Sequence, residues 1–128
     1  IEEIKNIMAT APQKLSLEEL YLVANSYESG SDNHHEVFEV AVRMFPNDEI
    51  ANLNAANSAM QKRDMDSAKR YLSRAGNSAE AVYARGAYSA MVEDYQTART
   101  QLKQAEAAGI AQATVTLKEI DTFVANNK

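Results

Sequence analysis

The sequence predicts an all-α fold built from antiparallel helix pairs. Two observations carry this prediction: a helical pattern of apolar residues that recurs along the chain, and a shortage of residues that interrupt helices. Glycine and proline contribute only 4 and 2 of the 128 residues, while 45% of the residues are apolar. This composition excludes disordered, linker-like and collagen-like chains. No stretch has the alternating apolar and polar pattern of a β-strand.

The recurring pattern is clearest in segments 65–75 and 95–105. Both carry apolar or small residues at offsets 0, 3, 7 and 10, a spacing that places them on one face of a helix. Asp64 and Asp94 come directly before the segments, where a carboxylate can accept hydrogen bonds from the free N–H groups of the first turn. A glycine follows each segment and suits a left-handed helix end. We therefore expect two helices that begin and end alike.

A second helix is expected before each of these two. One has an apolar stripe that begins at Ile50, and the other has an equivalent stripe that begins at Val82. Turns 62–64 and 92–94 separate the helices of each pair. Connections this short make the two helices of a pair antiparallel neighbours.

Gly86 is unusual because it lies inside one of these expected helices. Glycine in a helix interior costs about 1 kcal/mol relative to alanine, so its presence suggests that a neighbouring helix approaches closely there. On this basis Gly86→Leu should be destabilising through overpacking, whereas Gly86→Ala should be tolerated or stabilising.

The spacing of small and apolar residues resembles the tetratricopeptide repeat, a unit of two antiparallel helices and about 34 residues. This family has a small residue twelve positions before an alanine, then a large apolar residue and a second alanine. Segment 49–78 supplies these as Ala56, Ala68, Leu72 and Ala75, and segment 79–110 as Gly86, Ala98, Leu102 and Ala105. The resemblance implies a right-handed α-α superhelix.

A first, degenerate repeat is assigned to residues 15–48, so the three repeats together cover 15–110. Its packing positions are occupied by Leu22, Phe38, Ala41 and Pro46. Leu22 stands where the family has a small residue, and His34 stands where it has an alanine. The packing of this repeat is therefore expected to depart from the family pattern.

The segments at the two ends are expected to be helical. Residues 1–14 should form a short helix that caps the repeats or links them to a preceding domain, and Ser16 with Glu19 has the pattern of a capping box that starts the next helix. Segment 111–128 should form one amphipathic helix that covers the last repeat. Its apolar residues recur at helical spacing: Ala113, Leu117, Ile120 and Val124.

The resemblance also implies a partner-binding groove lined by the first helix of each repeat. The family's groove positions carry over to Glu19, Val23, Tyr27, Leu53, Asn57, Met60, Gln61, Tyr83, Ala87, Ala90 and Met91. Such a groove is largely apolar with Asn and Gln at its edges, which favours an apolar peptide or helix as its ligand. It lacks the basic residues with which chaperone-binding members of the family hold a terminal carboxylate.

Charge and motifs argue against other classes of function. Residues 1–48 carry nine acidic and three basic side chains, a net charge of −6, which disfavours nucleic acid as a partner. There is no cysteine, and no apolar run approaches the roughly 18 residues that span a bilayer. The adjacent His34 and His35 would point about 100° apart on a helix, so we expect one to lie exposed and the other to fill an inter-helix position. We expect no catalytic residue, no metal and no cofactor.

The sequence thus predicts a non-catalytic scaffold for protein-protein interaction. Its partner would be a peptide, another protein or a domain of the same chain, with neither nucleic acid binding nor direct membrane insertion. The alternative is a structural spacer that has no external ligand and self-associates weakly.

Segments 21–28 and 37–48 resemble the repeat region of bacterial envelope proteins that carry an outer-membrane-protein-A-like module. That resemblance implies a piece of a larger protein in the periplasm or cell envelope, with the cytoplasm as the alternative.

Overall fold

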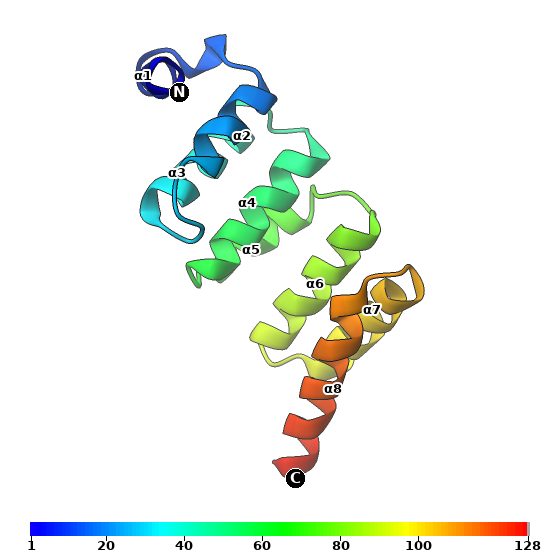
Figure 1. Ribbon diagram of the computed structural model, residues 1–128. Coiled ribbons are helices and arrows are strands. Elements are labelled where there is room, and N and C mark those ends of the chain that lie inside the picture. Colours follow the sequence, from blue (N-terminus) through cyan, green and yellow to red (C-terminus); the bar gives the residue numbers. More distant parts are fainter. Residues whose placement is uncertain (128) are drawn as a thin grey trace. The chain divides into compact units, whose positions relative to one another are not determined.

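A computed structural model describes residues 1–127 and shows an all-helical protein (Figure 1). Eight α-helices and one short 3-10 helix account for all the regular structure in this range, with no strand among them. The predicted all-α class is therefore confirmed. The chain forms two compact units, Ile1–Ala75 and the part that begins at Gly76.

The first unit contains five α-helices. In order these are α1 (Glu2–Thr10), α2 (Leu17–Asn25), α3 (Asp32–Met44), α4 (Glu49–Gln61) and α5 (Met65–Leu72), with the 3-10 helix η1 (Pro12–Lys14) between α1 and α2. Consecutive helices from α2 to α5 pack against one another, and α1 packs against α2 and η1. The core is formed mainly by α2 and α3 and contains Leu15, Leu20, Val23, Ala24, Val37, Val40 and Ala41.

The second unit contains α6 (Ala79–Met91), α7 (Tyr95–Ala107) and α8 (Ala111–Asn126). Helix α7 packs against both α6 and α8. Its buried side chains meet those of α8 in a second core, formed by Ala98, Leu102, Ala105, Ala113, Leu117 and Ile120. Lys128, the last residue of the expected final helix, lies outside the described residues.

Local capping interactions set the helix starts. Asp64 accepts a hydrogen bond from the Ser67 amide at 3.2 Å, and Asp94 accepts one from the Thr97 amide at 3.3 Å. Ser16 forms both halves of a capping box with Glu19 at the start of α2. The predicted caps are confirmed, and Gly76 and Gly109 are both left-handed, with φ of 77° and 99°.

The register expected for the first repeat is wrong at Leu22, whose side chain is 53% exposed. The reason is the start of α2, which lies at Leu17 rather than at residue 15. Counting eight residues from Leu17 reaches Ala24, which is buried, as are Ala56 and Gly86 at the eighth positions of α4 and α6. Ala24, not Leu22, is therefore the small buried residue at the eighth position of its helix, as Ala56 and Gly86 are in theirs.

The remaining expected packing residues differ in burial. Pro46 is exposed rather than packed, and it acts through its carbonyl, which accepts a hydrogen bond from the Asn52 side chain at 3.0 Å. Phe38 is partly buried against the first core. The others are buried: Ala41, Ala56, Ala68, Leu72, Ala75, Gly86, Ala98, Leu102 and Ala105.

Candidate functional site

The three residues of α2 that were expected to line the groove do not form an open surface. Val23 is completely buried in the first core, so its assignment to a partner-binding groove is wrong. The Glu19 carboxylate accepts a hydrogen bond from the Ser16 amide at 3.0 Å and serves the helix cap. Tyr27 is partly buried, and the Lys5 ammonium of α1 lies 4.6 Å from the centre of its ring. Helix α1 thus occupies the Tyr27 side of α2.

The groove residues expected on α4 and α6 are more accessible. On α4, Asn57 and Gln61 are exposed and Leu53 is partly exposed, whereas Met60 is buried, which makes its assignment to the groove wrong. On α6, all four expected residues are partly exposed: Tyr83, Ala87, Ala90 and Met91. Tyr83 and Ala90 also pack against the core of α7 and α8.

Two large apolar side chains that were not assigned to the groove are the most exposed ones on α2 and α4. Leu22 on α2 is 53% exposed and Ile50 on α4 is 62% exposed. Tyr21 and Leu53, on the same two helices, are partly exposed. We call Tyr21, Leu22, Ile50 and Leu53 the α2–α4 face. The start of α2 at its capping box was the sequence signal that could have identified Leu22 as exposed.

The Tyr21 side chain of α2 lies near the start of α4, but its buried hydroxyl has no hydrogen-bond partner among the described residues. Burial raises the pKa of its hydroxyl, the adjacent Asn54 side chain partly offsets this rise, and the Asp48 carboxylate adds to it. Asn54 lies one turn after Ile50 on α4, and Asp48 is the N-cap of that helix. The Tyr21 ring packs on Phe38 of α3, with 6.2 Å between the ring centres. Apolar and polar groups of three helices are therefore assembled around this tyrosine.

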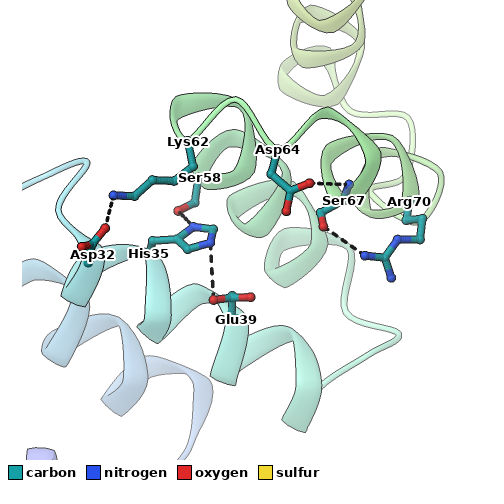
Figure 2. Close-up of polar contacts among 8 residues, drawn as sticks. All are labelled: Asp32, His35, Glu39, Ser58, Lys62, Asp64, Ser67 and Arg70. Carbon is teal, nitrogen blue, oxygen red and sulfur yellow. Dashed lines mark hydrogen bonds and ion pairs between the residues drawn. The ribbon is translucent and has the colours of Figure 1, made fainter.

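A polar cluster joins α3 to α4 on another part of the first unit. Figure 2 shows the His35 ring between Ser58 and Glu39: its Nδ1 lies 2.6 Å from the Ser58 hydroxyl and its Nε2 lies 3.4 Å from the Glu39 carboxylate. The expectation that one histidine fills an inter-helix position is confirmed, but His34 is half-buried against the Phe38 ring, 4.7 Å between ring centres, rather than exposed. Sequence reasoning missed Ser58 because it stands 23 residues from His35 with no local pattern to link them.

Charged groups border this cluster on both sides. Lys62, at the end of α4, forms an ion pair with Asp32 at the start of α3, and its hydrogen bond holds the pKa of the Asp32 carboxyl below its ordinary value. On the other side, hydrogen bonds from Ser67 lower the pKa of Asp64. Arg70 in turn donates to the Ser67 hydroxyl at 3.0 Å.

The serine, histidine and glutamate of this cluster have the composition of a hydrolytic triad but not its geometry. Ser58 is only 3% exposed, so a substrate cannot reach its hydroxyl. It also lies inside α4, where backbone N–H groups bond to carbonyls of the same helix and cannot stabilise an oxyanion. The arrangement suits a polar link between two helices, because the serine hydroxyl can donate to or accept from the ring nitrogen.

An open cleft of about 430 Å³ runs along α3 beside this cluster. It is lined by Asp32, His35, Glu36, Glu39, Val40 and Arg43.

Within residues 1–127, no three His, Cys, Asp or Glu side chains are grouped closely enough to hold a metal ion. None of the helices in the same range is long and apolar enough to cross a membrane.

Comparison with protein families and with curated proteins gives no match. No protein-family model matches its sequence, and no curated protein is significantly similar to it. The tetratricopeptide resemblance therefore depends on the residues and internal repeats of the chain itself.

Proposed function

We propose that this chain is a tetratricopeptide-like interaction module without catalytic function. The support comes from the equivalence of two helix pairs, α4 with α5 and α6 with α7. Both first helices have 13 residues, and both second helices follow an aspartate cap. The residues before these caps, Arg63 and Glu93, both have left-handed backbones, with φ of 63° and 66°. A repeat unit used twice explains this match between positions 30 residues apart.

The observation that carries a binding function is the exposure of Leu22 and Ile50. Single exposed apolar residues are ordinary on protein surfaces. Here, however, Tyr21 of the helix that carries Leu22 lies near the start of the helix that carries Ile50, where Leu53 is also partly exposed. Apolar side chains gathered in this way mark sites of interaction, because covering them with a partner removes apolar surface from water. We propose that a peptide or partner domain covers the α2–α4 face.

The alternative function is a spacer that self-associates. It is supported by Val115 and Phe123 of α8, each 47% exposed. Light scattering over a dilution series distinguishes the two, since a spacer should give a concentration-dependent dimer that Val115→Ser/Phe123→Ser abolishes.

Selection from a library of displayed random peptides tests the binding function. Peptides selected on the wild-type chain should bind the double variant Leu22→Ser/Ile50→Ser about tenfold or more weakly, because apolar anchors each contribute more than about 1 kcal/mol to a protein interface. Val92→Ser/Val115→Ser is the matched control, since it removes two exposed valines, 44% and 47% accessible, from the second unit. Equal binding to both double variants would contradict the proposed site.

We also propose a location in the bacterial periplasm or cell envelope. The support is the resemblance of segments 21–28 and 37–48 to repeats of envelope proteins. Fractionation of bacteria that produce the parent protein tests this, and recovery with cytoplasmic markers would contradict it.

A further inference from the structure

We infer that the α2–α4 face binds a basic amphipathic segment, one with apolar side chains on one side and Lys or Arg beside them. This inference rests on the proposed function and adds the chemical class of the partner. It is drawn from the charges that surround the face and from how few of them are neutralised within the chain.

The part of the chain that forms the face is strongly acidic. Residues 17–50 contain eight acidic side chains and one basic side chain, Arg43. The acidic residues are Glu18, Glu19, Glu28, Asp32, Glu36, Glu39, Asp48 and Glu49. A local net charge of −7 gives this part of the first unit a negative potential, which attracts cationic ligands and repels phosphate-bearing ones.

Three of these carboxylates belong to the surroundings of the face itself. Glu18 is exposed one helical turn before Leu22, and Asp48 and Glu49 are exposed directly before Ile50. Asp48 is also the N-cap of α4, the helix that carries Ile50 and Leu53.

These three carboxylates differ from the acidic groups of α3 in their ion pairing. Asp32 is paired with Lys62, and Glu39 lies beside His35. None of the ion pairs formed among residues 1–127 includes Glu18, Asp48 or Glu49. The Asp48 carboxylate accepts a hydrogen bond from the Ala51 amide at 2.8 Å, which stabilises its charge but does not neutralise it. The apolar face therefore has a rim of anions with which no cation among residues 1–127 forms an ion pair.

This combination favours one partner class over the others. An apolar surface alone would accept any apolar segment, whereas the carboxylate rim gives an advantage to segments that carry Lys or Arg next to their apolar residues. A second copy of the chain docked through the same face would bring like charges together. Membrane lipids are disfavoured as well, because the cytoplasmic and many envelope leaflets are anionic.

A set of three designed peptides tests the inference on the full chain. Each has about 18 residues with leucines at helical spacing, and the remaining positions are all Lys, all Gln or all Glu. Fluorescence anisotropy should show that the Lys peptide binds about tenfold more tightly than the Gln peptide at low salt, given several exposed charge pairs. The difference should shrink as salt screens those pairs, and the Glu peptide should bind most weakly.

Two sets of variants separate the charges from the apolar face. Glu18→Gln/Glu49→Gln should remove most of the advantage of the Lys peptide and leave the Gln peptide unaffected. Glu80→Gln/Glu119→Gln, which neutralises two exposed carboxylates of the second unit, is the matched control and should change neither affinity. Leu22→Ser/Ile50→Ser should weaken all three peptides.

The outcomes distinguish this inference from the function on which it rests. Equal affinity of the Lys and Gln peptides, with both weakened by Leu22→Ser/Ile50→Ser, would overturn the basic partner class and leave the binding face in place. Peptide binding that is absent, or unaffected by Leu22→Ser/Ile50→Ser, would overturn both. If the chain forms a dimer that Glu18→Gln/Glu49→Gln dissociates, the partner of the face is a basic surface of a second copy and not a basic segment. This result would also overturn the inference.

Discussion

Gly86 of α6 lies against Leu102 of α7 so closely that a Cβ atom at position 86 would be 2.7 Å from the Leu102 Cγ. Leu102 is completely buried, so its side chain has little room to move. The close helix approach expected from the sequence is therefore present. The approach is so tight that even the methyl group of alanine would overlap with Leu102. This reverses the expectation that Gly86→Ala is tolerated or stabilising.

We predict that Gly86→Ala destabilises the protein. Overpacking a core costs about 1–3 kcal/mol, which offsets or exceeds the gain of about 1 kcal/mol from the higher helix propensity of alanine. Gly86→Leu should be considerably worse. Urea denaturation followed by circular dichroism measures the free energy of unfolding of each variant.

The Leu102→Ala background serves as the control for this prediction. Leu102→Ala alone should cost about 2–5 kcal/mol through the cavity that it leaves. In that background the overlap is gone, so Gly86→Ala should become stabilising by up to about 1 kcal/mol. If Gly86→Ala changed the free energy of unfolding in the same direction in both backgrounds, α6 and α7 would not be in contact at these two residues.

The caps of α5 and α7 allow a matched comparison. Asp64→Ala and Asp94→Ala should each cost about 1 kcal/mol of unfolding free energy, because each removes the acceptor of an amide in the first turn. The corresponding Asn variants should retain most of the stability, since Asn is an equally good cap. If either Ala variant matched the wild type, the cap at that helix would not contribute to folding.

Acidic pH should weaken the Asp64 cap specifically. Hydrogen bonds from Ser67 hold the pKa of Asp64 below its ordinary value of 3.8 in the folded protein. The unfolded chain therefore binds the proton more readily, so the contribution of Asp64 is complete above that value and is lost as the pH falls through the lowered pKa. Asp64→Asn should show a smaller loss of stability between neutral pH and about pH 3 than the wild type, in parallel denaturation series.

The link between His35 and Ser58 should stabilise the packing of α3 on α4. Ser58→Ala removes the partner of a half-buried ring nitrogen and should cost about 1–3 kcal/mol. His35→Ala should remove most of the same interaction, so the double variant should be less destabilised than the sum of the two single variants. Additive losses in thermal denaturation would show that the two side chains do not interact in solution.

The helix boundaries that the sequence predicted correctly depend on local chemistry. Asp64, Asp94 and the capping box of Ser16 each act within one helical turn, so the residue types and their spacing are sufficient to identify them. Gly86 was also identifiable, since a glycine inside an apolar helical pattern has few explanations other than close packing.

The parts of the site that sequence reasoning missed depend on register and on distant contacts. Helix α2 begins at Leu17 and has 9 residues, whereas α4 and α6 have 13. Positions counted from residue 15 therefore misplaced Leu22 in the packing and Val23 in the groove. The contact of His35 with Ser58 joins separate helices, and no periodic pattern within one helix could reveal it.

Chemical-shift mapping by two-dimensional NMR tests the proposed binding face most directly. On titration with a peptide selected on the wild-type chain, the largest changes should fall on backbone amides of residues 18–25 and 50–57, and they should be absent in Leu22→Ser/Ile50→Ser at the same peptide concentration. Changes confined to α3 or α8, with the amides around Leu22 and Ile50 unaffected, would contradict the proposal that this face is the binding site.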